Sequence, residues 1–428
     1  MSGPASGAGA FRATTRPLPG TPDVLAASGD SGLFWQRERS GLAGRGEALR
    51  IHLPHGLDEP GAADRVAHAL GAIAADDEVG RPGTGPVAMG ALPFDRGAPA
   101  SVVVPEVLVG TDGESSWVTT VRRADAGQHA GEVERRAEEV VAAALGHRTR
   151  PAPAPPDEFR LVPSLSHARW MEVVAEAVEH IRAGDLGKVV LARRVDIEAN
   201  RPFATSDVLE RLGALYPSCM VFRMEGFVGA SPELLISRRD LTVASHPLAG
   251  TVARSGDAAA DRALVDALLA SPKERAEHAF VVDELGRALA PWCEALDVPD
   301  RPSILELRNV SHLATAVTGR LRPAPPTALR LVDAVHPTPA VAGTPTDKAT
   351  AYLQTAEGFD RGRYAGPVGW VSATGDGDWA IGIRSAVVDG ARASICAGVG
   401  VVADSDPRAE LAETQLKLQA LLAALVRP

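Results

Sequence analysis

The stretch that decides the fold is WAIGIRSAVVDGARASICAGVGVVADSDPRAELAETQLK, residues 379–417. Apolar residues alternate along residues 379–388 and again along residues 393–402, and the dipeptide Asp389-Gly390 between them favours the tight turn of an antiparallel hairpin. A helix is expected to begin near Asp406-Pro407, because proline is well accommodated in the first turn of a helix. The stretch therefore predicts two antiparallel strands followed by a helix.

The same stretch carries the side chains of a candidate anion and metal site. Gly398 and Gly400 end the second strand, where the absence of side chains lets backbone N–H groups approach a ligand. Glu410 and Glu413 are three residues apart, so both carboxylates project from one helix face, with Lys417 one turn further on. Two hard oxygen ligands suit Mg²⁺, which keeps coordination positions for water and substrate oxygens. A solvated acidic helix face is the alternative interpretation of such a pair.

The composition is that of an ordinary globular protein, with 428 residues of which 45% are hydrophobic and 23% charged. A net charge of −10, without a stripe of Lys and Arg, argues against a nucleic-acid surface. No apolar run approaches the roughly 18 residues that a membrane span needs. The three cysteines are far apart and form no CxxC pair, which indicates neither a disulfide framework nor a zinc site. We therefore expect a cytoplasmic protein with neither nucleic acid nor membrane as a partner.

Composition also divides the chain into four segments. Residues 1–20 are rich in Gly, Pro and small residues without an apolar signal core, and we expect a disordered tail there. Residues 21–147 alternate short strands and helices without legible chemistry, and we expect them to form the N-terminal part of a sandwich. Residues 148–164 form a Pro-rich connector, which is extended and semi-rigid. Residues 165–428 carry all the candidate site residues.

This last region combines antiparallel strands with separate helices. Ser166 is expected to cap a helix whose apolar positions repeat every 3.6 residues, and a strand with a buried middle is expected over residues 188–195. A long helix is predicted over residues 272–294. Residues 336–345 are too rich in Pro and Gly for a regular element, and long irregular loops inside compact domains are commonly functional. The pattern favours the α+β class over a repeating βαβ arrangement.

Several motifs in this region carry a resemblance to a known family. In chain order they are LGKVVLARR, GASPELL, PLAGT, SPKERAEH, SHLAT, HPTPAVAGTP, RGRYAGPVGW and AGVGVVADSDPRAELAET, all between residues 160 and 425. The set resembles the chorismate-utilising enzymes and is most similar to the isochorismate synthases. The resemblance implies two large antiparallel β-sheets packed as a sandwich with flanking helices, a site in the cleft between the halves, and a monomer. The N-terminal 150 residues resemble the family only loosely.

The resemblance also implies a reaction and two catalytic residues. Isomerisation of chorismate to isochorismate adds water at C2 while the C4 hydroxyl departs, which requires a base, an acid and charge neutralisation. Lys188 matches the general base, which must be uncharged to accept a proton from water. Glu233 matches the general acid that protonates the leaving hydroxyl, a role that calls for a carboxyl pKa raised by burial. Considered alone, Lys188 reads as a surface lysine and Glu233 as a carboxylate at the start of a strand.

A metal and a set of substrate contacts follow from the same resemblance. It implies Mg²⁺ held by Glu277, Glu410 and Glu413 and bridging to the ring carboxylate of chorismate. Arg384 matches the residue that clamps the enolpyruvyl carboxylate, for which a planar guanidinium is suited. The other positions that match substrate-contacting residues are Gly250, Thr251, His312, Ala340, Tyr364, Gly398, Gly400 and Lys417. His312 also fits the role of a satisfied core histidine.

Four positions separate the branches of the family. Ala249 stands where aminodeoxychorismate synthases carry a nucleophilic lysine, and Lys188 is usually missing from anthranilate synthases. Ala340 stands where the salicylate, anthranilate and aminodeoxychorismate enzymes tend to have Thr, whereas Tyr364 is common in salicylate synthases. Isochorismate synthase is therefore the favoured function, and salicylate synthase, which further eliminates pyruvate, is the alternative.

Two other classes of function remain open. A non-catalytic protein could keep the cleft for a chorismate-like ligand, although the set of catalytic and metal-binding positions is complete. A nucleotide site at residues 398–400 would need the fuller pattern G-x-G-x-x-G, and position 403 is Ala. The sequence does not choose among menaquinone, siderophore and salicylate pathways for the product.

Overall fold

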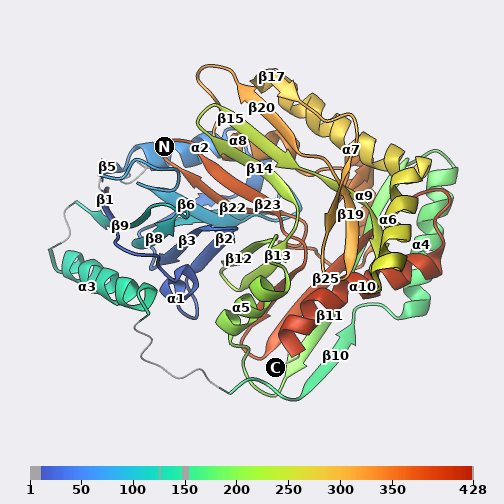
Figure 1. The fold of residues 1–428 in the computed structure, drawn as a ribbon, viewed down its shortest axis with the longest axis horizontal. Coiled ribbons are helices and arrows are strands. Elements are labelled where there is room, and N and C mark those ends of the chain that lie inside the picture. The colour runs from blue at the N-terminus through green and yellow to red at the C-terminus, as the bar shows by residue number, and fades with distance from the viewer. Residues whose placement is uncertain (1–10, 125–126, 147–153, 427–428) are drawn as a thin grey trace, which may run out of the picture.

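The fold is built on two large β-sheets (Figure 1). The computed structural model describes residues 11–124, 127–146 and 154–426. Within these residues one sheet has thirteen strands, a second has nine, and a third, smaller sheet has three. Neighbouring strands run antiparallel except for one parallel pair at an edge of the larger sheet, β1 with β5. The predicted α+β class with two large antiparallel sheets is confirmed, whereas the third sheet was not foreseen.

The strands follow a definite spatial order in each sheet. The larger sheet consists, in order, of β10 (Phe159–Pro163), β11 (Lys188–Ala199), β25 (Arg392–Val401), β24 (Ser385–Asp389), β13 (Phe227–Ser231), β12 (Met220–Met224), β2 (Leu33–Arg37), β3 (Ser40–Arg45), β8 (Val107–Thr111), β9 (Ser116–Arg123), β1 (Phe11–Pro17) and β5 (Ala74–Asp77), with β21 (Gly343–Thr344) beside β11. The second consists of β17 (Cys293–Asp297), β20 (Val317–Leu321), β15 (Thr242–His246), β14 (Leu234–Arg239), β23 (Gly377–Ile381), β22 (Pro367–Ser372), β6 (Val87–Ala91), β7 (Ala100–Val104) and β4 (Leu49–Leu53). The third consists of β16 (Leu248–Ala253), β19 (Val310–Ala314) and β18 (Ser303–Glu306).

The helices lie outside these sheets, and two of them, α6 and α7, pack against the third sheet at one end of the molecule (Figure 1). They are α1 (Val24–Ser28), α2 (Ala62–Gly71), α3 (Gly127–Ala144), α4 (His167–Arg182), α5 (Thr205–Leu215), α6 (Ala258–Ala270), α7 (Pro272–Leu289), α8 (Ala328–Val335), α9 (Thr346–Ala356) and α10 (Pro407–Val426), with short 3-10 turns at Gly56–Asp58 and Ala290–Trp292. Among the described residues, no helix has the length and apolar character to cross a membrane.

Among the described residues, the N-terminal region supplies six of the thirteen strands of the larger sheet and three of the nine strands of the second. Its β2 pairs with β12 of the catalytic region, where Trp35 lies opposite Phe222. Its β6 pairs with β22, where Met89 lies opposite Trp370. These four side chains are buried in one apolar cluster that spans both regions. Residues 21–147 were expected to form a part of the sandwich, and they share both sheets and a core with the catalytic region.

Three segments expected to be irregular contain strands, and the loop 336–345 is one of them, because its residues Gly343–Thr344 form β21 beside β11. The predicted disordered tail over residues 1–20 is wrong for Phe11–Pro17, which form β1 because alternate side chains, starting with Phe11, point into the core. Residues 1–10 lie outside the described residues. The Pro-rich connector 148–164 likewise ends in β10, which pairs with β11 at the sheet edge, where Pro163 is tolerated. Residues 148–153 of that connector lie outside the described residues.

The stretch 379–417 forms the expected hairpin and helix with one difference. β24 and β25 join through Asp389-Gly390, where Gly390 has a φ of 56°, and α10 begins at Pro407. The first predicted strand, however, is two strands in different sheets. β23 ends at Ile381, and the chain crosses to the larger sheet before β24 begins at Ser385. Arg384 therefore lies in the crossing, with a φ of 50°, and not within a strand.

The first helix of the catalytic region agrees with its prediction. The Ser166 hydroxyl accepts a hydrogen bond from the backbone N–H of Arg169 at 3.2 Å, which caps α4. Its predicted apolar face is buried, with Trp170, Val173, Val174, Ala177, Val178 and Ile181 inside. The long helix predicted over residues 272–294 ends earlier, at Leu289, because a 3-10 turn and β17 follow it.

Candidate active site

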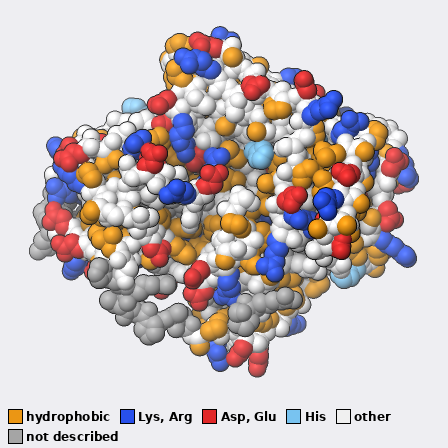
Figure 2. Space-filling model, in the orientation of Figure 1, with side chains coloured by type: hydrophobic (Ala, Val, Ile, Leu, Met, Phe, Trp, Pro, Cys, Tyr) orange, Lys and Arg blue, Asp and Glu red, His pale blue; other side chains and the backbone are white. Residues whose placement is uncertain are grey.

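All the predicted site residues line one pocket, and they reach it from separate segments of the chain. The segments are β11, the start of β14, β16, α7, β19, the loop 336–345, residues 361–365, the crossing before β24, β25 and α10. The predicted residues in the lining are Lys188, Glu233, Gly250, Thr251, Glu277, His312, Ala340, Tyr364, Arg384, Gly398, Gly400, Glu410, Glu413 and Lys417. On the face seen in Figure 2, acidic and basic side chains are interspersed, so a local charge at the pocket has to come from its own lining.

One end of the pocket pairs glutamates with lysines. Lys188 Nζ lies 2.6 Å from Glu277 Oε1, and Lys188 is only 7% exposed. Lys417 Nζ lies 2.6 Å from Glu413 Oε1 and donates to the carbonyl oxygen of Gly398 at 3.0 Å. Each lysine therefore neutralises one glutamate, and the second pair also ties α10 to β25. We call this part of the pocket the acidic end.

Two further carboxyl groups at the acidic end, those of Glu410 and Glu274, have raised pKa values. Burial and the charge of the neighbouring Glu413, opposed by a hydrogen bond from Ser405, raise the pKa of Glu410 to about 7. Burial and the charge of Glu277 likewise raise the pKa of Glu274. Each of these carboxylates makes the charged form of its neighbour less favourable, and a divalent cation bound among them would stabilise those charged forms. This donor set of hard oxygens fits Mg²⁺.

The lysine pairs also determine how the glutamates are arranged. Across residues 11–124, 127–146 and 154–426, no three His, Cys, Asp or Glu side chains are already gathered closely enough to hold a metal ion. Glu277 and Glu413 point instead to Lys188 and Lys417. The acidic end thus offers the ligand types for Mg²⁺, with two of its carboxylates engaged by ammonium groups.

Glu233 is buried apart from these pairs. It precedes β14 and is 4% exposed. Burial raises the pKa of its carboxyl to about 7, against the opposing effects of a hydrogen bond from the Leu248 backbone and the charge of Lys188. Its own backbone is fixed, because its carbonyl accepts from Ile381 N at 3.1 Å and its N–H donates to Ser231 Oγ at 3.2 Å. The carboxyl group can therefore hold a proton near neutral pH, as an acid catalyst requires.

His312 is linked to Arg384. Its Nδ1 lies 2.9 Å from the hydroxyl oxygen of Thr251, and its Nε2 lies 3.5 Å from a guanidinium nitrogen of Arg384. Burial, together with the charges of Arg384 and Lys417, holds the pKa of His312 well below its usual range. Because a guanidinium only donates, Nε2 accepts and the proton resides on Nδ1, which donates to Thr251. His312 is thus a neutral support for Arg384 at the pocket surface.

Arg384 offers a cation that the protein does not neutralise. Within the described part of the chain, no carboxylate forms an ion pair with it, so its charge is available to an anionic ligand. Its left-handed backbone is held in place, because its carbonyl accepts from the Ala230 N–H at 3.1 Å. Tyr364 is buried nearby in the same lining, and burial raises the pKa of its phenol, which keeps the hydroxyl group as a donor. We call this part of the pocket, with Glu233, the proton-holding end.

The glycines of β25 make room for side chains from facing elements. A Cβ at Gly400 would lie 2.8 Å from Lys188 Cε and 3.2 Å from Glu277 Oε1. A Cβ at Gly398 would lie 3.2 Å from the hydroxyl of Tyr364. The sequence suggested that these glycines expose backbone N–H groups to a ligand. The structure gives a further reason, since each leaves space for a different side chain of the pocket.

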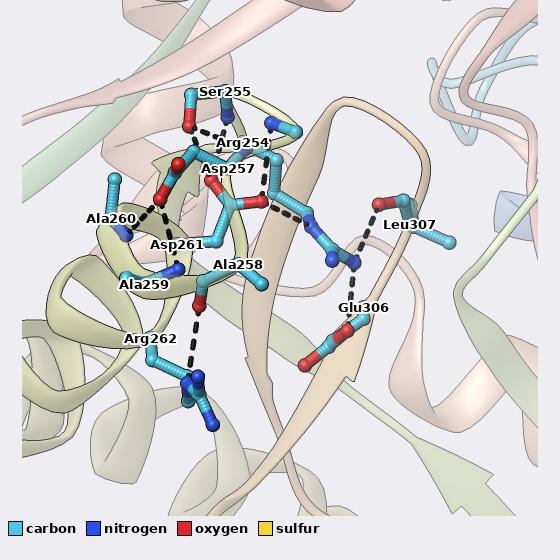
Figure 3. Close-up of polar contacts among 11 residues, drawn as sticks. Arg254, Ser255, Asp257, Ala258, Ala259, Ala260, Asp261, Arg262, Glu306 and Leu307 are labelled. Atoms are coloured by element: carbon cyan, nitrogen blue, oxygen red, sulfur yellow. Dashed lines mark hydrogen bonds and ion pairs between the residues drawn. The ribbon is translucent and has the colours of Figure 1, made fainter.

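The loop after β16 is held by a buried carboxylate (Figure 3). Asp261 of α6 accepts from the backbone N–H and the hydroxyl of Ser255, at 2.7 and 2.9 Å. Arg254 Nε lies 3.4 Å from Asp261 Oδ2, and its NH1 lies 2.8 Å from Glu306 Oε2 of β18. These contacts tie the end of β16 to α6 and β18, and so support the strand that presents Gly250.

Three charged residues of the lining were not predicted. Lys273 and Glu274 lie on α7 with Glu277, and Arg361 lies between α9 and β22. The spacing from Glu274 to Glu277 places both on one helix face, so this signal was legible in the SPKERAEH motif. Arg361 is buried and forms an ion pair with Glu357 at 2.5 Å. Both residues lie beyond the end of α9 at Ala356, so no helical pattern in the sequence pointed to this pair.

Comparisons with known proteins place these observations in a family. A family model described as chorismate binding enzyme matches residues 23–426. The chain is 35% identical to the isochorismate synthase DhbC of Bacillus subtilis over 353 residues, which are 79% of this chain and 81% of that relative. Among solved structures, DhbC from Bacillus anthracis has a TM-score of 0.77 and 32% identity, covering 94% of this chain and 98% of that one. The menaquinone-specific isochorismate synthase MenF from Escherichia coli has a TM-score of 0.79 and 26% identity, with coverages of 97% and 95%.

Proposed function

Because the chain belongs to the chorismate binding enzyme family, we propose that it is an isochorismate synthase, which converts chorismate into isochorismate. One observation supports this proposal most. Glu233 and Lys188, the acid and the base that the reaction needs, line the same pocket, and burial keeps a proton on the Glu233 carboxyl near neutral pH. Both residues are buried, so the surrounding water does not compete with the reacting groups.

Lys188 is proposed to remove the proton from the attacking water. Its amine lies 2.6 Å from Glu277 Oε1, so this contact has to loosen before the amine can reach the water. Gly400 leaves the space that the side chain occupies. Lys188 starts β11, and the ladder of β11 with β25 fixes the direction from which the amine enters the pocket.

Glu233 is proposed to protonate the departing C4 hydroxyl. Its backbone is hydrogen-bonded on both sides, so the carboxyl group keeps its position during the reaction. Arg384 is proposed to bind the enolpyruvyl carboxylate, oriented by neutral His312. Tyr364 is proposed to donate a hydrogen bond from its hydroxyl group to the same carboxylate. The remaining predicted lining residues, Gly250, Thr251, Ala340, Gly398 and Lys417, are proposed to contact the substrate.

The acidic end is proposed to hold Mg²⁺ through Glu277, Glu410 and Glu413. Bound there, the ion supplies positive charge that offsets the carboxylates and attracts the ring carboxylate of the substrate. The raised pKa of Glu410 supports this assignment, because burial and the neighbouring Glu413 disfavour its charged form, which a bound cation would stabilise. We further propose that the protein works as a monomer.

Salicylate synthase is the second candidate, and Tyr364 favours it because this branch commonly carries Tyr at the matching position. The buried phenol stays protonated in the pocket, as an additional donor beside the substrate. Ala340 favours the first candidate. The two proposals differ only in whether isochorismate leaves the pocket before pyruvate is eliminated from it.

The test is the product that the purified protein forms from chorismate and Mg²⁺, followed by liquid chromatography and mass spectrometry. Accumulation of isochorismate is the expected result. Release of salicylate and pyruvate would establish the second candidate instead, and anthranilate formed with ammonia would exclude both. Chorismate that binds without being converted, as measured by calorimetry, would leave a non-catalytic binding protein. Light scattering during gel filtration checks the monomer.

A further inference from the structure

A short segment of the N-terminal region, residues 92–96, contacts the loop 336–345, which forms part of the pocket wall. None of the described residues before Lys188 lines the pocket itself. The loop 336–345 does, because Ala340 and Val341 form part of its wall. Phe94 and Arg96 reach that loop from the opposite side. The N-terminal region can therefore act on the pocket only through elements such as this loop.

Arg96 caps the helix that leads into the loop. Its NH1 donates to the carbonyl oxygens of Asp333, at 2.9 Å, and His336, at 2.6 Å. Its NH2 lies 2.7 Å from Asp333 Oδ1, and its Nε lies 2.8 Å from Asp58 Oδ1. Asp333 lies in the last turn of α8 and His336 follows it, so a cation satisfies carbonyls at the negative end of the helix. The guanidinium thus fixes the point where the loop begins.

Phe94 holds the same point through its backbone and its ring. Its carbonyl oxygen accepts from His336 Nε2 at 3.1 Å, and burial lowers the pKa of His336 to about 3, which keeps that ring neutral. Its N–H donates to the carbonyl of Gly362 at 2.8 Å. The guanidinium carbon of Arg361 lies 4.3 Å from the centroid of the Phe94 ring. Phe94 therefore joins the start of the loop to Arg361.

Arg361 completes the chain of contacts to the pocket wall. Its NH1 donates to the carbonyl of Val341 at 2.8 Å, and its NH2 donates to the carbonyl of Val190 on β11 at 2.5 Å. Glu357, its ion-pair partner, also accepts from the backbone N–H of Ala192 at 2.6 Å. The loop is thus held at its start by residues 94 and 96, and at its centre by Arg361, which also braces the strand that begins with Lys188.

We propose that Arg96 and Phe94 are positioning residues, which set the pocket wall at Ala340 and Val341 without touching the substrate. The proposal rests on the proposed function in one respect, because the position of the pocket wall is measured through the KM for chorismate. Arg96 suits a test, since its side chain is 26% exposed and its removal leaves no void in the core. Arg330 provides a matched control: it pairs with the same Asp333 at 2.7 Å but does not bond to the loop.

The first measurement is steady-state kinetics of Arg96→Ala, Arg96→Lys and Arg330→Ala with chorismate. In Arg96→Ala the KM is expected to rise about fivefold, because small displacements of positioning groups carry large kinetic costs. Arg96→Lys is expected to recover part of this loss, whereas Arg330→Ala stays within about twofold of wild type. A partly unfolded preparation would lower kcat at an unchanged KM, so KM separates positioning from general destabilisation. Equal rises in both alanine variants, or none in either, would overturn the proposal.

The second measurement is independent of turnover. Hydrogen–deuterium exchange is expected to accelerate across residues 336–345 in Arg96→Ala, including the amides of Val341 and Ala342, which bond to the Thr338 carbonyl at 3.1 and 3.0 Å. Arg330→Ala should leave this exchange unchanged. If the wild-type protein failed to convert chorismate, the proposed function would be wrong. The exchange measurement would still test the role of Arg96, because it does not depend on turnover. Unchanged exchange in Arg96→Ala would refute that role.

Discussion

The two ends of the pocket treat buried charge in opposite ways. At the acidic end, Glu277 and Glu413 each have a carboxylate oxygen 2.6 Å from the side-chain nitrogen of a lysine. At the proton-holding end, Glu233 is buried away from any such close partner, and its pKa rises to about 7. The comparison teaches that deep burial without a close cation keeps a proton on Glu233, whereas Glu277 and Glu413 are less buried and each has a lysine partner.

Among the changes that test this comparison, removal of Lys188 should have the largest effect on turnover. In Lys188→Ala the acidic end loses the proposed base, and Glu277 loses its partner. General base catalysis is typically worth 10²–10⁴, so we expect kcat to fall by about a thousandfold. Chorismate turnover measures the loss, and far-ultraviolet circular dichroism checks that the variant is folded. Activity near the wild-type level would remove Lys188 from its role.

Replacing Glu233 tests the other end of the pocket. Glu233→Gln keeps the size and a hydrogen-bond donor but cannot transfer a proton, so kcat should fall by about a hundredfold.

In the wild type, kcat should decrease as the pH rises above about 7, because the protonated form of Glu233 is lost there. A wild-type rate that keeps rising through that range would argue against a protonated Glu233.

The glycines of β25 sharpen the contrast between the two ends. Gly400→Ala would bring a Cβ to 2.8 Å from Lys188 Cε, whereas Gly398→Ala approaches only the Tyr364 hydroxyl, at 3.2 Å. We expect a loss in kcat/KM of about tenfold for Gly400→Ala and about threefold for Gly398→Ala. The two variants serve as controls for one another because they lie on the same strand. A larger loss in Gly398→Ala would reverse the assignment of the ends.

Binding of Mg²⁺ should depend on the acidic end alone. MgCl₂ is expected to raise the thermal midpoint of the wild type, because a ligand that binds only the folded state stabilises it. Glu410→Gln should weaken the affinity for Mg²⁺ by about tenfold, as measured by titration calorimetry. Glu233→Gln should bind Mg²⁺ as wild type does. An equal loss in both variants would contradict the division of roles.

The smallest expected effect is on stability. The folded-state pKa of Glu233 is raised from 4.5 to about 7, so the folded protein binds a proton that the unfolded chain has released between these values. Its contribution is fully present below pH 4.5 and is lost as the pH rises through about 7. The thermal midpoint of the wild type should therefore fall more over this range than that of Glu233→Gln. Parallel curves for the two proteins would show that Glu233 is not protonated in the fold.

Much of the site could be predicted from the sequence, because its residues lie in motifs that mark local structure. Ser166 and Pro407 begin their helices as expected, since capping and the first helical turn depend on neighbouring residues alone. The ion pair of Lys188 with Glu277 could not be predicted, because it joins residues far apart in the chain and depends on how the fold places α7 relative to β11. The arrangement of charges had to come from the fold.

The fold could be predicted in class but not in the course of the chain. The apolar alternation continues across Gly382 to Arg384, so no local pattern indicates that the chain changes sheets there. Some N-terminal strands join the larger sheet and others join the second sheet. Their places depend on pairings between distant residues, such as Trp35 with Phe222, which local sequence patterns do not predict. The Pro-rich composition before residue 164 likewise concealed β10 at the sheet edge.

The most direct test of the central claim is the source of the new oxygen atom. Wild-type protein is incubated with chorismate and Mg²⁺ in water enriched in ¹⁸O, and the product is analysed by mass spectrometry and NMR. Activation of water by Lys188 and loss of the C4 hydroxyl through Glu233 predict isochorismate with one ¹⁸O atom, located at C2. Unlabelled isochorismate, or conversion without any isochorismate intermediate, would contradict the account.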